Sequence, residues 1–161
     1  MVPPTGWRAL LDDELERIVA DDLQDWLDES ICDPANEPKI HDPSPGQLAL
    51  FAITEFEQAL WNEGVHTALY NDDGIVLPAA KEGYRHFGIP QMERFVGKII
   101  QFLEFTPYPY DREERMRRLP DREEFAAEYD ALYKEFENTV SVRAGTVANY
   151  VRAHPEEFFE S

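Results

Sequence analysis

The sequence predicts an all-α fold, a single compact domain of six or seven helices. Apolar residues recur at steps of three and four along nearly the whole chain, the spacing that places them on one face of a helix. The 161 residues match the size of one domain, and 43% of them are hydrophobic, which is enough for a core despite a net charge of −18. No segment has the length and alternation that predict a strand.

The first predicted helix occupies the acidic N-terminal region, residues 1–32. Between residues 10 and 33, ten of 24 residues are Asp or Glu and one is Arg. Like charges one turn apart destabilise a helix, so burial of an apolar face must hold this helix together. The residues of that face are Leu11, Leu15, Ile18, Val19, Leu23 and Trp26.

Four acids of this helix form a strip beside its apolar face. At about 100° per residue they fall within about 60° of one another, and they span about 21 Å. They are Glu14, Asp21, Asp25 and Asp28. A DNA strand carries a phosphate about every 3.4 Å, so several helices or two subunits would have to combine their carboxylates to match it. Asp22 falls on the apolar side, where either the helix ends or bends or a second subunit packs.

A proline-rich linker is predicted over residues 33–46, because proline removes a backbone donor and disfavours helix in the residue before it. A second helix begins at the end of this linker. Ser44 can cap it, Pro45 suits its first turn, and Gln47 completes a capping box.

The later helices follow from apolar spacing and from the breaks between them. They are predicted to run to about residue 62, over 65–70, over 75–86, from Met92 to Leu103, from an Asp121 cap with Glu124 to Phe136, and from Val140 through Ala144 to a point before Pro155. A further helical turn is expected within residues 111–120. Residues 47–159 are thus expected to form the helical core of the single domain.

The acidic residues are concentrated in the N-terminal half. Residues 1–37 hold eleven acids and two arginines, and residues 40–80 hold six acids with neither Lys nor Arg, whereas residues 111–122 are nearly balanced. Nucleic acids and anionic membranes both select basic surfaces, so we expect this protein to bind neither directly. A basic protein surface is the partner that such an acidic one attracts.

Other features predict a cytoplasmic protein without catalytic chemistry. No apolar run is long enough to span a membrane, no secretory signal is visible at the start, and the single Cys32 cannot form an internal disulfide. No phosphate-binding loop or hydrolase motif occurs, and the four histidines share no metal-ligand spacing. The stretch YNDDGI at 70–75 echoes a calcium loop but lacks its alternating ligands. We therefore expect no enzyme activity, no cofactor and no metal.

One stretch, LWNEGVHTALYNDDG at residues 60–74, resembles the motif of a bacterial family of small acidic all-helical domains. That motif is an Asn-Gly-Gly-Phe turn followed by a Gln, aromatics and a second Asn. Asn62, Gly64 and Asn71 match it, whereas Glu63 and Val65 stand in place of a Gly and the Phe. The resemblance continues in FGIP and in VANYVRAHPEEF, and it covers roughly residues 45–159 and, more loosely, the acidic first helix.

The family is long classed as of unknown function, and its characterised representative is a DNA-mimic protein. The resemblance implies an all-α fold and a dimer whose acidic surface imitates DNA phosphates and occupies the DNA-binding surface of a transcription regulator. We expect the matching residues to be structural. Gly64 would allow a positive φ at a turn, and Asn62 and Asn71 would bond nearby backbone.

The function we infer from charge and resemblance is DNA mimicry. Exposed carboxylates would take the place of phosphates, bind the basic surface of a DNA-binding protein and block it. The protein would act alone or as a homodimer. The candidate partner-binding residues are Asp12, Asp13, Glu14, Asp21, Asp25, Asp28 and Glu29, with a possible second patch of Glu55, Glu57, Glu63, Asp72 and Asp73.

Three other interpretations stay open. The protein could be an acidic immunity or antitoxin protein that neutralises a basic toxin, for which the physics is the same and only the partner differs. It could be a domain adapted to high salt, which would spread its acids over the whole surface rather than segregate them. It could also be an enzyme that uses carboxylates to hold a metal, although no ligand spacing supports this.

Overall fold

Helices build the whole of the described fold. The computed structural model describes residues 5–21, 43–143 and 145–159, apart from the side chains of Trp7, Asp72 and Asp73, and it contains no strand in these ranges. The helices are α2 (Pro45–Tyr70), α3 (Leu77–His86), α4 (Pro90–Phe102), α5 (Arg112–Arg118), α6 (Ala126–Thr139) and α7 (Thr146–Ala153). Short 3-10 turns are η1 (Trp7–Ala9), η2 (Asp72–Val76), η3 (Val140–Arg143) and η4 (Pro155–Glu157). The prediction of an all-α fold is confirmed.

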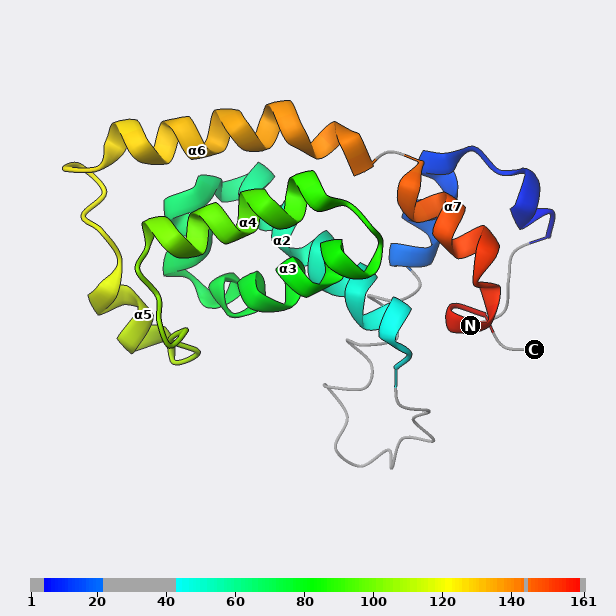
Figure 1. Ribbon diagram of the computed structural model, residues 1–161, viewed down its shortest axis with the longest axis horizontal. Coiled ribbons are helices and arrows are strands. Elements are labelled where there is room, and N and C mark those ends of the chain that lie inside the picture. Colours follow the sequence, from blue (N-terminus) through cyan, green and yellow to red (C-terminus); the bar gives the residue numbers. More distant parts are fainter. Residues whose placement is uncertain (1–4, 22–42, 144, 160–161) are drawn as a thin grey trace.

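Residues 12–21 are also helical, and we call them the N-terminal helical segment. Figure 1 shows α2, α3 and α4 grouped at the centre, with α6 running along one side of them. Helix α5 lies at one end, whereas α7 and the N-terminal helical segment lie at the other. None of the described helices is both long enough and apolar enough to cross a membrane.

Aromatic side chains join the four longest helices in one core. Phe56 of α2 packs edge-on against Tyr84 of α3 and against Phe136 of α6, with ring centroids 6.3 and 6.4 Å apart. Phe95 of α4 lies 6.5 Å from Phe56. The apolar stripe predicted for the fifth helix is buried in α4, where its residues fill the space between α3 and α6. This core fixes the positions of α2 and α6, whose ends make the contacts described below.

The start of α2 follows the sequence prediction. The Ser44 hydroxyl accepts a hydrogen bond from the Gln47 backbone at 3.1 Å, and the Gln47 side chain accepts one from the Ser44 backbone at 2.9 Å. The predicted capping box is confirmed, because both reciprocal bonds form.

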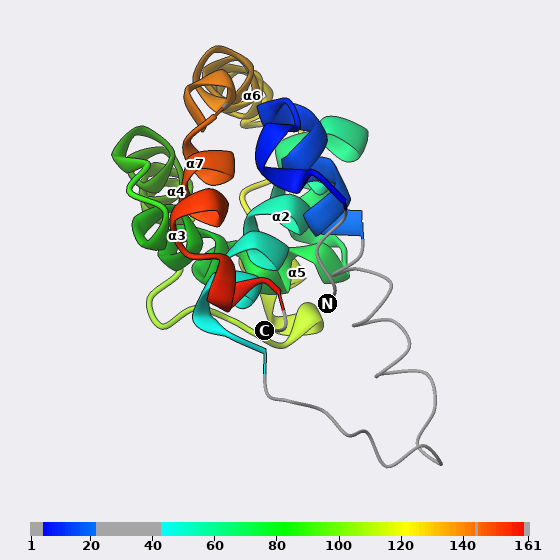
Figure 2. The ribbon, with the colours of Figure 1, turned by 90° about the vertical axis from the view of Figure 1, so that its right-hand side faces the viewer.

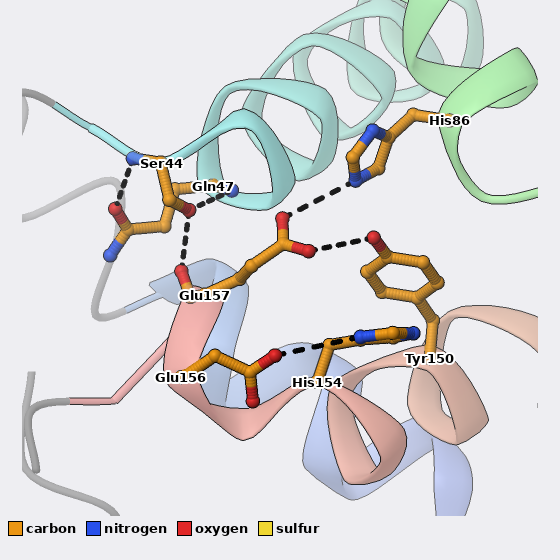
Figure 3. Close-up of polar contacts among 7 residues, drawn as sticks. All are labelled: Ser44, Gln47, His86, Tyr150, His154, Glu156 and Glu157. Carbon is orange, nitrogen blue, oxygen red and sulfur yellow. Dashed lines mark hydrogen bonds and ion pairs between the residues drawn. The ribbon is translucent and has the colours of Figure 1, made fainter.

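The C-terminal turn η4 closes on this start of α2 (Figure 3). The Ser44 hydroxyl also donates to the backbone carbonyl of Glu157 at 2.5 Å. The Glu157 carboxylate accepts from Tyr150 at 2.8 Å, and its second oxygen lies 3.4 Å from the His86 Nε2 atom of α3. Phe158, the next residue, is buried. Residues far apart in the sequence therefore meet at one corner of the bundle.

A kink at Gly64 divides α2 into the two helices that the sequence predicts. Gly64 has φ 72° and ψ 173°, inside a helix that otherwise runs from Pro45 to Tyr70. The predicted positive φ is confirmed. A Cβ atom at Gly64 would meet nothing within 4 Å, so the backbone angle, not crowding, requires glycine here. Asn71 bonds the Glu63 side chain across this kink at 2.9 Å rather than bonding nearby backbone through its amide.

Arg115 clamps the end of α2 to the loop before α5. Its side chain is 1% exposed, and its guanidinium donates to the backbone carbonyls of Leu69 at 2.8 Å and Asn71 at 2.7 Å. It also donates to Pro109 and Tyr110 at 3.2 and 3.3 Å. The last carbonyls of a helix have no partner within the helix, and a cation near them also interacts favourably with the helix dipole. Arg115 thus satisfies this terminus from outside.

The last two helices begin later than the sequence predicts. Asp121 does accept bonds from the backbone of Glu123 and Glu124, yet α6 begins at Ala126 after a turn. The sequence predicts that the seventh helix includes Val140, but Val140 begins η3 instead. Gly145 with φ 76° then separates η3 from α7, because that left-handed conformation interrupts a helix. Ala144 lies outside the described residues.

We expect Arg115→Lys to destabilise the protein by about 3 kcal/mol, because a lysine ammonium cannot reach carbonyls on two sides and leaves some of them buried and unpaired. The free energy of unfolding in urea measures this. Arg117→Lys on the exposed side of the same helix is the control, for which we expect a change within about 0.5 kcal/mol. Equal effects of the two substitutions would contradict the clamp.

Alanine substitution of two glycines should change stability in opposite directions. Gly64→Ala is expected to destabilise by about 2 kcal/mol, because alanine disfavours the backbone angles of the kink. Gly97→Ala in α4 is expected to stabilise by up to about 1 kcal/mol, since its Cβ would make only ordinary contacts with Lys81. Thermal unfolding of both variants measures the difference, and a neutral Gly64→Ala would show that the kink does not need glycine.

Candidate functional site

The N-terminal helical segment docks on the core through an apolar face. Leu15 and Val19 are fully buried, and Ile18 is partly buried. Figures 1 and 2 both show residues 5–21 next to α7 and close to the end of α6. The sequence also predicted burial of Leu11, which is wrong: its side chain is 72% exposed, because it precedes the first turn of the helix. Leu23 and Trp26 lie outside the described residues.

Arg152 of α7 holds the beginning of this segment. One guanidinium nitrogen lies 2.6 Å from an Asp12 carboxylate oxygen, and the other donates to the backbone carbonyl of Leu10 at 2.6 Å. The other Asp12 oxygen lies against Gly145, where an added Cβ would come within 2.7 Å of it. Asp12 is therefore a docking residue as well as a half-exposed carboxylate.

Below this contact, two buried carboxylates share one arginine. Arg143 of η3 lies 3.3 Å from Glu16 of the N-terminal helical segment and 3.1 Å from Glu57 of α2. Glu16 also accepts a bond from the Ala148 backbone at 3.2 Å, and Glu57 accepts one from the Tyr84 hydroxyl at 2.7 Å. Both glutamates are 7% exposed. We call Glu16, Glu57 and Arg143 the buried triad.

Burial dominates the protonation of the triad. It raises the pKa of Glu57 to about 7, even though Arg143 and the Tyr84 hydroxyl both favour the charged form. Burial also raises the pKa of Glu16 against the opposing effects of Arg143 and the Ala148 backbone N–H. Desolvation and the Glu57 carboxylate raise the pKa of Tyr84 well above its usual value, so Tyr84 is the donor in this bond.

The outward side of the N-terminal helical segment carries exposed acids. Asp13, Glu14 and Asp21 are all exposed, and Asp21 makes a surface ion pair with Arg17 at 3.1 Å. Asp25, Asp28 and Glu29, together with Asp22, lie outside the described residues. The strip that the sequence predicts is thus described only for its first half.

The second predicted patch is not a single surface. The prediction that Glu57 belongs to an exposed patch is wrong. Glu57 is buried in the triad, because it lies one turn from Ile53 and Leu60 on the inward side of α2. Glu55 is partly buried and Glu63 is exposed. Asp72 and Asp73 belong to η2, and their side chains are outside the description.

Sequence reasoning missed a second acidic surface, along α6. Its exposed acids are Glu123 and Glu124 in the preceding turn, then Glu128, Asp130 and Glu137 in the helix. Arg122 and Lys134 are the exposed cations beside them. A helical wheel of residues 121–139 would have found these acids, because they fall on the flanks and the far side of the helix, away from its apolar positions. The overall charge balance of the C-terminal half concealed them.

A cavity of about 490 Å³ lies between the N-terminal helical segment and the junction of α6 and α7. Its lining residues come from the N-terminal helical segment and from the junction of α6 and α7: Asp12, Asp13, Glu16, Val140, Ser141, Arg143 and Gly145. Within the described residues, no three His, Cys, Asp or Glu side chains gather in a way that could hold a metal ion. What this region offers chemically is a set of carboxylate acceptors for cationic groups.

Comparison with known families identifies the family of most of the chain. A family model described as DMP19-like protein matches residues 41–154. The chain belongs to the DMP19-like family. The family resemblance seen in Asn62, Gly64 and Asn71 is confirmed by this match. No curated protein and no solved structure shows significant similarity to the chain.

The match sets the N-terminal helical segment apart from the rest of this DMP19-like protein. The matched region begins at residue 41 and includes helices α2 to α7. Residues 5–21 lie before it and are not part of the match. Arg143 and Arg152, which hold the segment in place, lie inside the matched region. The docking site for the acidic segment is therefore part of the DMP19-like core.

Removing the shared arginine should leave two buried carboxylates facing each other. We expect Arg143→Met to destabilise the protein by about 3 kcal/mol near pH 8 and by less near pH 5.5, because a carboxylate with a raised pKa loses stability as the pH rises. Unfolding in urea at both pH values measures this. Arg17→Met removes the same charge from the surface, and we expect less than about 1 kcal/mol from it. A loss that does not depend on pH would contradict the interpretation.

Proposed function

We propose that this protein is a DNA mimic that binds the basic DNA-binding surface of a DNA-binding protein, such as a transcription regulator, and blocks it. The observation that carries the proposal is membership of the DMP19-like family, a family of DNA mimics. The exposed carboxylates of the N-terminal helical segment and of α6 support the same role. We propose no catalytic activity for it.

The density of carboxylates favours a surface made of both elements. Asp13, Glu14 and Asp21 span about 12 Å of helix, at 1.5 Å per residue. A DNA strand would present a phosphate about every 3.4 Å over that length, so one helix alone is too sparse. From Glu128 to Glu137, α6 adds acids over about 14 Å. Because Asp13 and Val140 line the same cavity, the N-terminal helical segment and the end of α6 approach each other there.

The proposed mechanism is electrostatic. A net charge of −18 steers a basic partner toward the protein, and carboxylates then accept charge-assisted hydrogen bonds from its Lys and Arg side chains. DNA and this protein compete for the partner because both bind the same Lys and Arg side chains on its surface. Homodimer formation, which would double the acidic surface, stays a prediction that sedimentation of the full chain tests.

Competition by DNA is the decisive measurement. The immobilised protein should retain a DNA-binding protein from a bacterial lysate, and a double-stranded oligonucleotide should release it. Raising the salt concentration should release it too, because exposed charges are screened. Retention of a basic protein that duplex DNA does not displace would contradict mimicry and favour an immunity or antitoxin role. If no DNA-binding protein is retained at all, the proposal fails.

Charge-neutral variants locate the surface. We expect Asp13→Asn, Glu14→Gln and Asp21→Asn together to weaken binding of the retained partner at least about tenfold, because three carboxylates of the contact are lost. The matched control neutralises Glu82, Glu104 and Glu113 on α3 and around α5, which changes the net charge by the same amount. Titration calorimetry of both triple variants decides between a local contact and a general effect of charge.

A further inference from the structure

We propose that the N-terminal helical segment is held by a proton-dependent latch: the buried triad keeps the segment docked when one of its two carboxylates carries a proton, and it releases the segment as both ionise. The inference concerns the docking of residues 12–21 on the core. It holds whether or not the exposed acids of that segment meet a DNA-binding protein.

The latch lies at the junction of separate parts of the fold. Glu16 comes from the N-terminal helical segment, Glu57 from the middle of α2, and Arg143 from the turn η3 between α6 and α7. The segment thus shares the partly buried Arg143 with a carboxylate of the core. Any competition for that cation acts directly on the attachment of the segment.

The groups facing the two carboxylates do not supply a second cation. Around Glu57 these are the Tyr84 hydroxyl from α3, Arg143 from η3 and Glu16 from the segment itself. Around Glu16 they are Arg143, the backbone N–H groups of Ala148 and Gly145, and the Asp12 carboxylate. Arg152 is engaged by Asp12 and by the Leu10 carbonyl. Two carboxylates therefore face one guanidinium, which leaves a net negative charge on two groups that are each only 7% exposed when both are ionised.

A single proton removes that excess charge. With one carboxyl neutral, Arg143 pairs with one carboxylate and the neutral group keeps a hydrogen bond. With both ionised, the like charges repel each other at low dielectric, and undocking of the segment lets water reach Glu57. A group whose pKa is raised in the docked state favours docking below that pKa and loses this effect above it. Burial raises the pKa of both glutamates, that of Glu57 to about 7.

The expected size follows from this titration. Between about pH 6 and pH 8, a carboxyl with a pKa of about 7 when docked and 4.5 when solvated shifts the opening equilibrium about tenfold toward the undocked state. Leu15 and Val19 continue to favour docking at both pH values, because their burial does not depend on protonation. The latch thus adjusts the docking equilibrium without unfolding the core.

Hydrogen exchange on the full chain tests the latch. We expect the protection factors of amides in residues 15–21, corrected for the intrinsic exchange rate, to fall about tenfold between about pH 6 and pH 8. Protection in α4 reports the stability of the core and should change far less. If the two regions lose protection in parallel, the change is global unfolding and the latch is overturned.

Two variants assign the effect to the triad. Glu57→Gln keeps the shape and removes the competing charge, so we expect protection of residues 15–21 to become nearly independent of pH. Glu16→Gln leaves one carboxylate for Arg143 from the other side, and we expect it to flatten the profile as well, which keeps the test decisive if one variant folds poorly. Glu63→Gln, an exposed change on the same helix as Glu57, should keep the wild-type profile. A tenfold fall that persists in both triad variants would overturn the proposal.

Discussion

The sharing of Arg143 between two buried glutamates is the constraint on which the end of the fold that carries the N-terminal helical segment depends. It joins the N-terminal helical segment, α2 and the turn between α6 and α7 at one point. Apolar burial of Leu15 and Val19 attracts the segment to the core but does not orient it, because hydrophobic contacts are not directional. The ion pairs supply that direction, so the outward acids of the segment occupy a defined place.

Three of the fifteen basic residues of this chain bond inward and so add little positive charge to its surface. Arg115 is turned inward onto backbone carbonyls, Arg143 onto buried carboxylates, and Arg152 onto Asp12 and the Leu10 carbonyl. Guanidinium groups suit this use, since their planar fork of donors reaches several acceptors at once. Among the exposed charged residues of α6 and the N-terminal helical segment, acids outnumber the cations Arg17 and Lys134. The inward bonding of these three arginines thus leaves the acids of the surface with fewer cations beside them.

The family match and the docking geometry both distinguish two parts of the chain, the matched region and the N-terminal helical segment. The matched region, residues 41–154, contains the bundle and the two arginines that receive the N-terminal helical segment. The segment itself lies outside the match and adds Asp13, Glu14 and Asp21 beside the acids of α6. A surface assembled from both parts presents more carboxylates than either helix alone, which is what imitation of a phosphate row requires. Its attachment through titratable groups makes that surface responsive to protons.

Local chemistry determined much of the fold from sequence alone. The Ser44 capping box, the kink at Gly64 and the buried stripe of α4 depend on residues within a few positions of one another, so their patterns predict them. Tertiary structure decided the rest. Glu57 and Glu16 look like other acids in the sequence, and only the tertiary structure brings Arg143, far along the chain, to both of them. Arg115 likewise gives no sign of burial in the sequence, and only the tertiary structure shows that it bonds the end of α2. Which charges face water and which face each other is a long-range property, because burial depends on what packs above a residue.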